Sequence, residues 1–399
     1  MPVLVRTQIM NEFNLVKMSD LSVLPTTLAE AQTHARHWLF SVAAPLWSTA
    51  GVLKDGMFSE RINLDGSPAS EMNRRLRVQA RQIYSFSAIG ALGWDGPWRE
   101  LTERAADILV TSGRREDGMF VHLFNPQGEV INTAQDLYDH AFGLFALAHA
   151  AQALDRPDFC DVADTIRMRM MTDWWRPQGG FWEGELTPCP PYRQNPHMHM
   201  FEAALINYQV SGKAVWRELA DRLGELFVER FQDRASGAVT EYFDENWKPV
   251  AGDQGRIVEP GHCFEWAWLF EVGFADGLGL ATSDRLTDFA RKYGIERKHG
   301  VAINEIMLDG ATRDSGARLW PQTERLKAAV ARYNRLRTPE EAAEAVSAYN
   351  GLWPYLDVSV PGTWRDRMNA DGTWVEEPSP ASSFYHIVCG LGELLKLKP

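Results

Sequence analysis

The sequence of 399 residues has few cysteines, no excess of basic residues and no long apolar run. Its four cysteines form no Cys-x-x-Cys pair, which favours reduced thiols over a disulfide framework or a zinc site. The net charge of −12 is opposite to the balance typical of nucleic-acid-binding proteins. No apolar run reaches the roughly 18–20 residues that span a bilayer, and the first residues lack the apolar core of a signal peptide. We therefore expect a cytoplasmic protein without nucleic-acid or membrane partners.

Motifs for bound cofactors and for interdomain linkers are missing as well. The chain has no glycine-rich loop that would cradle a phosphate, no HExxH motif and no cysteine-rich cluster, so we expect no cofactor and no metal. It also has no Pro/Ser-rich linker and no low-complexity segment. Residues 1–399 are therefore predicted to form a single domain, of which 1–25 are an N-terminal extension.

What the chain does have is an internal repeat of about 62 residues. Six glycines recur at spacings of 62, 62, 57, 63 and 62 residues, and the first two stand in the same phrase, Asp-Gly-Met-Phe. The glycines are Gly56, Gly118, Gly180, Gly237, Gly300 and Gly362. Aromatic residues, a polar turn and further strand-like residues surround several of them, as in a short β-hairpin. A fixed period of this length indicates a repeat architecture.

Two helical stretches fill each unit between the hairpins. The stretches after each hairpin are apolar on nearly every face and cover roughly 70–93, 134–154, 197–212, 261–280, 319–336 and 381–397. The stretches before each hairpin are amphipathic and cover roughly 27–47, 97–113, 157–175, 214–233, 283–296 and 339–352. Buried helices alternating with amphipathic ones predict an all-α fold, an (α/α)6 barrel of twelve helices with the hairpins at one end. An open six-repeat superhelix is the alternative.

Polar residues stand at the beginnings of the predicted inner helices, where apolar residues are expected. Four histidines recur near the repeat length, at spacings of 59, 63 and 124 residues: His140, His199, His262 and His386. In a closed barrel, equivalent positions on the inner helices converge on the axis, and Arg81 joins them from the first inner helix. Burying several polar groups without a purpose is costly, so we interpret this constellation as the lining of a pocket.

Several of these residues have structural alternatives. His140 is equally consistent with bracing its neighbours, and Arg81 and Glu324 are consistent with a structural ion pair. His149 is interpreted as a hydrogen-bonded core residue. The histidines outside the repeat pattern are interpreted as surface or loop residues: His34, His37, His122 and His299.

Two His-x-x-Glu steps, His199/Glu202 and His262/Glu265, place a carboxylate on the same helix face as each histidine. Such a carboxylate can fix the tautomer of a histidine and raise its basicity. The same geometry could ligate a metal, although no further metal motif supports that alternative.

Six phrases in order along the chain resemble the N-acylglucosamine 2-epimerase superfamily, which includes cellobiose 2-epimerases, mannose isomerases and sulfoquinovose isomerases. They are RVQAR (77–81), DLYDHAFGL (136–144), NPHMHMFEA (195–203), EPGHCFEW (259–266), RLWPQTE (318–324) and SFYH (383–386). The resemblance implies an (α/α)6 barrel and metal-independent proton transfer at sugar C2, and the segment 378–386 looks most like the mannose isomerase branch. The catalytic residues that it implies are Arg81, His199, His262 and His386. The sugar-binding residues that it implies are Tyr138, Asn195, Glu265, Trp320 and Glu324.

Together, the residues and the resemblance predict an aldose–ketose isomerase that interconverts D-mannose and D-fructose through a cis-enediolate, with histidines as proton carriers. His262 is expected to help open the pyranose ring and His386 to remove the C2 proton. Arg81 and His199 would stabilise the enediolate oxygens. A sugar 2-epimerase of the N-acylglucosamine or cellobiose type is the alternative. An inverting glycoside hydrolase and a non-catalytic binding protein are the rivals from other classes.

The expected partner is a small monosaccharide, a neutral hexose of mannose type, and the protein itself is expected to be a monomer or a homodimer. Phosphate sites usually combine a glycine-rich loop or a helix N-terminus with Lys or Arg, whereas the motifs here supply mainly Asp, Glu, His and aromatic residues. Arg193 and Arg256, on the loops before two inner helices, are the candidates for binding an anionic C6 group. Arg318 is expected to pair with a carboxylate such as Glu324. A phosphorylated or sulfonated hexose is the competing substrate.

Overall fold

The computed structural model describes residues 23–275 and 277–398. Most of the predicted N-terminal extension, residues 1–22, therefore lies outside the described residues. Within them, no helix combines the length and the hydropathy that crossing a membrane requires.

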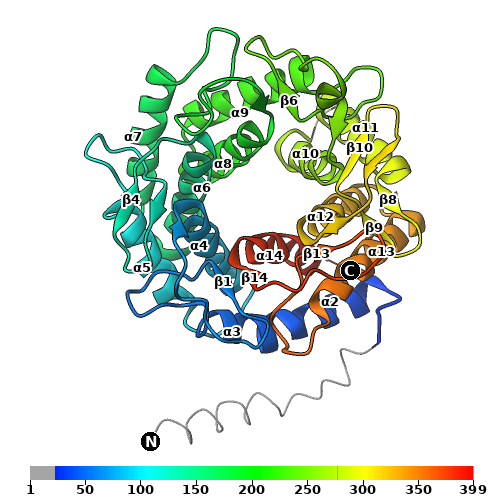
Figure 1. Ribbon diagram of the computed structural model, residues 1–399, viewed down its shortest axis with the longest axis horizontal. Coiled ribbons are helices and arrows are strands. Elements are labelled where there is room, and N and C mark those ends of the chain that lie inside the picture. Colours follow the sequence, from blue (N-terminus) through cyan, green and yellow to red (C-terminus); the bar gives the residue numbers. More distant parts are fainter. Residues whose placement is uncertain (1–22, 276, 399) are drawn as a thin grey trace, which may run out of the picture.

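Six helices form an inner ring around the barrel axis. They are α4 (Leu76–Ala91), α6 (Leu137–Leu154), α8 (Asn195–Ser211), α10 (Pro260–Gly273), α12 (Leu319–Leu336) and α14 (Ala381–Lys396). Each helix contacts the next, and α14 contacts α4, so that the last inner helix lies beside the first (Figure 1). The ring is closed. The predicted barrel is confirmed, and the open superhelix is excluded.

An outer layer of six helical segments surrounds this ring in the described part of the chain (Figure 1). The first is α2 (Leu28–Trp38), continued by the π-helical turn η2 (Leu39–Ala43) and α3 (Ala44–Trp47). The others are α5 (Trp98–Val110), α7 (Asp158–Asp173), α9 (Ala214–Leu226) with the π-helical turn η3 (Phe227–Phe231), α11 (Gly277–Tyr293) and α13 (Pro339–Leu356). These helices bury one face only; α5, for example, buries Leu101, Ala105 and Leu109 against the inner ring.

Helix boundaries differ most from prediction between the fourth inner helix and the fifth outer helix. The predicted helix 261–280 ends at Gly273, and the helix predicted to begin at 283 begins at Gly277. Gly273 packs against the side chain of Leu205, where a Cβ would lie only 2.7 Å from Leu205 Cδ1. The apolar run therefore belongs to two helices and the turn between them, a division that hydropathy alone does not mark.

Short antiparallel strands lie where the inner helices begin. Three pairs are local, namely β3 (Leu123–Phe124) with β4 (Val130–Asn132), β8 (Ile295–Glu296) with β9 (Val301–Ala302), and β10 (Glu305–Met307) with β11 (Thr312–Asp314). Five pairs join neighbouring units: β2 (Arg74–Arg75) with β3, β5 (Tyr192–Arg193) with β6 (Tyr242–Phe243), β7 (Ile257–Val258) with β10, β12 (Ala317–Arg318) with β13 (Arg367–Met368), and β14 (Ser379–Pro380) with β1 (Arg61–Ile62). In each of these five, one strand directly precedes an inner helix. The strands thus fix the starts of the inner helices to the adjacent unit.

The repeating glycines have a common backbone conformation. All six lie in the left-handed region, with φ between 68° and 91°, where a residue with a side chain is strained. The period of the sequence therefore records a turn of fixed geometry at the start of each hairpin.

A side chain of the inner helix holds the segment after this glycine in several units. The backbone N–H of Phe58 donates to Gln79 Oε1 (2.7 Å), and that of Phe120 donates to His140 Nε2 (3.0 Å). The same bond joins Phe181 to His197 Nε2 (2.9 Å). His140 is thus equivalent to His197 and not to His199. Of the two alternatives for His140, the structure therefore supports the one in which it braces its neighbours, and a place among the pocket histidines is wrong.

The prediction that His34 lies at the surface or in a loop is also wrong. It is buried on α2, and its Nδ1 lies 2.7 Å from the hydroxyl oxygen of Tyr349 on α13. Its ring also stacks edge-on against Trp353. His34 therefore helps to join the first outer helix to the last.

Candidate active site

A cavity of about 260 Å³ opens at the end of the barrel where the inner helices begin. Its lining residues are Arg81, Tyr138, Asn195, His199, Glu259, His262, Glu265, Arg318, Trp320, Asp366, Ser382, Ser383 and His386. Eight of the nine residues predicted for the site are among them. The ninth, Glu324, is fully buried behind His386. The volume is slightly below the range of roughly 300–1,000 Å³ for drug-sized ligands, so it suits a small molecule.

His262 stands in the first turn of α10 and is held by a carboxylate from the hairpin that precedes this helix. Its Nδ1 lies 2.9 Å from Glu241 Oε2, and the same oxygen accepts a hydrogen bond from Gln194 Nε2 (2.9 Å). Burial disfavours the charged ring, but the charges of Glu241 and Glu259 outweigh it and raise the pKa of His262 to about 9. The His-x-x-Glu step pairs His262 with Glu265, but the carboxylate that hydrogen-bonds His262 is that of Glu241. His262 is therefore a cation at neutral pH.

Glu241 was missed although the repeat contains a signal for it. Glu60, Glu183 and Glu241 each follow a repeating glycine by three or four residues. Each accepts a backbone N–H from a residue just before an inner helix: Arg75 at 2.6 Å for Glu60, Arg193 for Glu183, and Glu259 at 3.3 Å for Glu241. In the fourth unit this structural carboxylate has a histidine beside it, and that neighbour gives it a second role.

His386 lies on α14 across the pocket and has the opposite ionisation. Its Nδ1 lies 2.8 Å from Glu324 Oε1, and Glu324 Oε2 lies 2.7 Å from the ammonium nitrogen of Lys327. Burial lowers the pKa of His386 to about 4, despite the opposing effect of Glu324. His386 is therefore neutral at pH 7, and a hydrogen bond from its Nδ1–H to Glu324 leaves the lone pair on Nε2.

The ring of Trp320 contacts both histidines. Its centroid lies 4.9 Å from that of His262 and 5.8 Å from that of His386. A protonated and an unprotonated imidazole therefore face one small cavity from either side of an indole.

The third histidine, His199, belongs to a network on the wall formed by α8 and α14. Its Nδ1 lies 3.3 Å from Glu202 Oε2, as the His-x-x-Glu step predicts. Tyr385 donates its hydroxyl to both oxygens of Glu202, at 3.0 and 2.9 Å. Burial lowers the pKa of His199 to about 4, so this ring is also neutral.

Arg81 enters the pocket over a surface of aromatic rings. Its guanidinium carbon lies 4.2 Å from the centroid of Phe142 and 5.2 Å from that of Tyr385. Its Nη2 donates to the hydroxyl of Tyr138 at 2.6 Å. Arg81 thus bonds to a phenol, and the alternative of an Arg81–Glu324 ion pair was wrong, because Glu324 pairs with Lys327.

Three buried polar atoms at the pocket have no hydrogen-bond partner within the described residues: Arg81 Nε, Asn195 Oδ1 and Glu265 Oε1. An unpaired buried polar group costs roughly 1–3 kcal/mol. Burial, together with the nearby charge of Glu324, raises the pKa of Glu265 well above its usual value. The pocket therefore offers hydrogen-bonding groups that a polar ligand would satisfy.

The mouth of the pocket contains residues absent from the predicted set. Arg318 Nη2 donates to Glu259 Oε2 at 2.8 Å, so Arg318 pairs with a carboxylate as expected, although the partner is Glu259 and not Glu324. Ser383 donates its hydroxyl to Asp366 Oδ1 at 2.6 Å. Burial raises the pKa of Asp366, and the hydrogen bond from Ser383 opposes that shift. The mouth is thus lined by a paired arginine and two carboxyl groups.

The two arginines predicted as candidates for an anionic C6 group do not line the cavity. Arg193 Nε donates to Glu183 Oε2 at 2.9 Å, and Arg256 Nη2 donates to Asp309 Oδ2 at 2.7 Å. Each is therefore engaged by a carboxylate outside the pocket.

Carboxylates and histidines gather closely enough around the pocket to raise the question of a metal. The ammonium group of Lys327, 2.7 Å from Glu324, already supplies a cation to one such group. Arg318 supplies another to Glu259, and Tyr385 occupies both oxygens of Glu202. Protein cations and donors thus contact several of these carboxyl groups, and we assign no metal ligand among them.

Comparisons with known proteins agree with this geometry. The chain is 40% identical over 370 residues to the mannose-6-phosphate isomerase of Rhizobium meliloti (strain 1021), covering 90% of this chain and 95% of that protein. It is 26% identical over 293 residues to the D-mannose isomerase of Thermobifida fusca, covering 66% and 70% of the two chains. A crystal structure of a D-mannose isomerase superimposes with a TM-score of 0.83 at 20% identity, over 94% of this chain and 100% of that chain.

A helical barrel whose pocket is lined by histidines and carboxyl groups, with these relatives, defines an enzyme of the sugar isomerase and epimerase class. The family model described as N-acylglucosamine 2-epimerase (GlcNAc 2-epimerase) matches residues 56–390. The chain belongs to this family.

Proposed function

We propose that the protein is an aldose–ketose isomerase that interconverts D-mannose and D-fructose through a cis-enediolate intermediate. The observation that carries this proposal is the opposite ionisation of two histidines across one small cavity. The pKa of His262 is raised to about 9 and that of His386 is lowered to about 4. Near neutral pH the pocket thus holds a general acid and a general base at the same time, as proton transfer next to a carbonyl requires.

The reaction begins with opening of the pyranose ring. His262 donates a proton from Nε2 toward the ring oxygen, because its Nδ1 is engaged by Glu241. The C1 hydroxyl gives up its proton as the C1 carbonyl forms, and uptake of that proton restores the protonated His262. The open-chain aldose then presents an acidified C2–H to the cavity.

His386 removes the C2 proton with Nε2, while Glu324 holds Nδ1. The electron pair of the C2–H bond forms the C1–C2 double bond, and O1 becomes the enediolate oxygen. Arg81 is placed to stabilise that charge, and the neutral ring of His199 supplies a hydrogen bond. A proton then passes from O2 to O1, and His386 returns its proton to C1, which yields the ketose.

A free hexose is the preferred substrate within this proposal. Two arginines line the cavity, and one of them, Arg318, is paired with Glu259. Glu259, Glu265 and Asp366 are the carboxyl groups of the lining. This composition suits the hydroxyl groups of a neutral sugar better than a phosphate dianion.

Mannose 6-phosphate is the second candidate, favoured by the similarity to the mannose-6-phosphate isomerase of Rhizobium meliloti at 40% identity. Epimerisation at C2 is the alternative outcome at the same site. It would follow if a second histidine returned the proton to the opposite face of C2.

One experiment separates these outcomes. The protein is incubated in D2O with mannose and, separately, with mannose 6-phosphate, and NMR follows both deuterium uptake and the product sugar. We expect fructose from mannose, with deuterium incorporated at C1. Glucose as the product would show that the enzyme is an epimerase and not an isomerase. A higher kcat/KM for mannose 6-phosphate would overturn the assignment to a neutral sugar. No exchange with either sugar would contradict the proposal.

A further inference from the structure

A lysine without exposed surface lies in the barrel interior behind the two proposed catalytic histidines. Lys327, one helical turn after Glu324 on α12, places its ammonium nitrogen 2.7 Å from Glu324 Oε2. Neither side chain has any solvent exposure. The same nitrogen lies 3.9 Å from the centroid of Trp268 on α10. Burial of a lysine is expensive unless its charge is paired, so this position calls for an explanation.

The groups around Lys327 come from four inner helices. Besides Glu324 they are Glu265 from α10, Glu202 from α8, and Cys389 and His386 from α14. The ligand-type atoms of Glu265, Glu324 and His386 all lie within 4.8 Å of one another, as do those of His199, Glu202 and Glu265. Three buried carboxyl groups therefore share a single lysine, and two of them stand next to proposed catalytic histidines.

Like charges in this cluster oppose one another's ionisation, so the position of the cation favours the carboxyl group that it contacts. Lys327 contacts Glu324 directly. Burial opposes the ionisation of Glu324, but the charge of Lys327 and the hydrogen bond with His386 lower its pKa below the usual value. Glu265 has no such contact with Lys327, and its pKa is raised. Glu324 thus remains an acceptor for His386 Nδ1–H.

We propose that Lys327 is a positioning residue of the active site: its ammonium group selects Glu324 over Glu265 as the ionised carboxylate, and Glu324 in turn orients the His386 ring with its free nitrogen toward the sugar. Lys327 acts through Glu324 and does not touch the substrate. The effect of Lys327 on catalysis rests on the proposed function, whereas the effect of Lys327 on the His386 ring does not.

Removing the cation should make the Glu324–His386 pair bind a proton at higher pH. If the proton goes to Glu324, His386 loses its charged hydrogen-bond acceptor. If it goes to His386, the base is already occupied. Either location inactivates the base, so the direction of the effect does not depend on which site binds the proton.

The test is Lys327→Met with two readouts. The first is the titration of the His386 ring, followed by NMR on histidine-labelled protein. The second is kcat/KM for mannose as a function of pH. We expect the titration and the acid limb of the profile to move upward by about one pH unit or more, which is about a tenfold loss on that limb. An unchanged titration of His386 would overturn the proposal.

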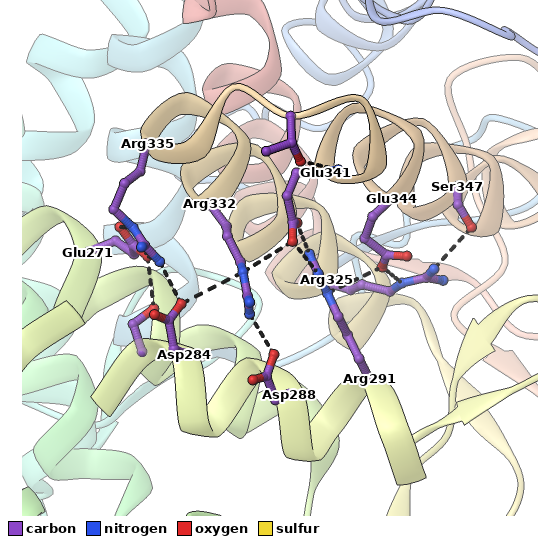
Figure 2. Close-up of polar contacts among 12 residues, drawn as sticks. Glu271, Asp284, Asp288, Arg291, Arg325, Arg332, Arg335, Glu341, Glu344 and Ser347 are labelled. Carbon is purple, nitrogen blue, oxygen red and sulfur yellow. Dashed lines mark hydrogen bonds and ion pairs between the residues drawn. The ribbon is translucent and has the colours of Figure 1, made fainter. Parts of the chain in front are cut away.

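Arg325→Met is the matched control, because it removes another buried cation from the same helix. Arg325 lies two residues before Lys327 but points to the outer face of α12, where it pairs with Glu344 at 2.9 Å (Figure 2). It should lower stability without moving the pH profile. An equal shift in both variants would show a general effect of unfolding and would refute the role of Lys327.

If Lys327→Met fails to fold, Lys327→Gln replaces it, because the amide can still donate to Glu324 while the charge is lost. The same upward shift is expected, and its absence refutes the proposal. If the wild-type enzyme does not exchange mannose protons, the proposed function fails, but the NMR titration still tests the role of Lys327.

Discussion

Helix α12 carries two clusters of charged residues on opposite faces, and they differ in how the charges are matched. The outer cluster joins α12 to α10, α11 and α13, and its arginines and carboxylates interleave (Figure 2). Its members are Arg291, Arg325, Arg332, Arg335, Glu271, Asp284, Asp288, Glu341 and Glu344. The inner cluster, around Lys327, places three carboxyl groups near a single lysine.

The difference teaches how to separate structural ion pairs from a site of proton chemistry. In the outer cluster each carboxylate lies within salt-bridge distance of an arginine; Glu341, for example, has Arg291 at 2.7 Å and Arg332 at 3.2 Å. The pKa of Glu341 is lowered in spite of its burial, because Arg291 donates to it. In the inner cluster Glu265 and Glu324 shift in opposite directions. Like charges that cannot all ionise are a mark of acid–base function.

The largest effect is expected from His262→Ala and His386→Ala. Each should reduce kcat for mannose by at least about two orders of magnitude, the usual contribution of a general acid or base. Stopped assays of fructose formation measure this, and urea unfolding checks that both variants remain folded. Near-wild-type turnover in either variant would remove that histidine from the mechanism.

A smaller effect, confined to alkaline pH, is expected from Glu241→Gln. The carboxylate of Glu241 helps to raise the pKa of His262 to about 9, so losing its charge should lower that pKa. The alkaline limb of the kcat/KM profile should move downward by about one pH unit or more, which is tenfold less activity on that limb. If the limb stays in place, Glu241 does not set the charge of His262.

Acid sensitivity of the fold should follow from the buried neutral histidines. The pKa values of His140, His197, His199 and His386 are lowered to about 4, whereas an unfolded histidine has a pKa of about 6.5. The unfolded chain therefore binds more protons between these values, and stability should fall as pH drops from about 6.5 toward 4. His262 works in the opposite direction, since its raised pKa adds stability below about 6.5 that is lost as pH rises through 9.

The variant His140→Gln/His197→Gln tests this acid effect. Glutamine already makes the equivalent bond at Gln79 and Gln322. Urea midpoints at pH 5 and pH 7 should differ less in the variant than in the wild type, while turnover at pH 7 stays unchanged. An equal loss of stability in both proteins would mean that these two histidines do not control it.

The smallest effect should come from the outer cluster. Arg332→Ala removes contacts with Asp288, which is largely exposed, and with Glu341. Partly exposed pairs contribute about 1 kcal/mol or less, so unfolding should become easier by that amount with no change in the pH profile of activity. A shift of the profile would contradict the separation of the two clusters.

Periodicity made the barrel predictable, because each glycine in the left-handed region marks the same turn. It also placed Arg81, His199, His262 and His386 near the beginnings of inner helices, whereas the other predicted residues of the pocket lining came from the resemblance to the family. The same periodicity misled at His140. Its spacing of 59 residues to His199 is close to the repeat, but its structural counterpart is His197, two residues earlier.

The partners of the proposed catalytic residues were beyond the reach of the sequence. The bond between Glu241 and His262 depends on the approach of a hairpin to a helix 21 residues away. Nothing in the sequence distinguishes Lys327 from the other basic residues of α12. Its position inside the barrel follows from the packing of four helices. Arg318 and Glu324 lie in one motif, yet Arg318 binds the carboxylate of Glu259, whereas Glu324 binds the ammonium group of Lys327.

The pairing of β14 with β1 has a consequence for synthesis on the ribosome. These strands lie more than 300 residues apart in the sequence, and His386 follows β14 by six residues. A nascent chain that has emerged only as far as α13 contains the sequences of five inner helices but lacks α14 and with it His386, the proposed base. Completion of the proposed site therefore requires that the final helix be inserted between α12, made shortly before it, and α4, made near the start of translation.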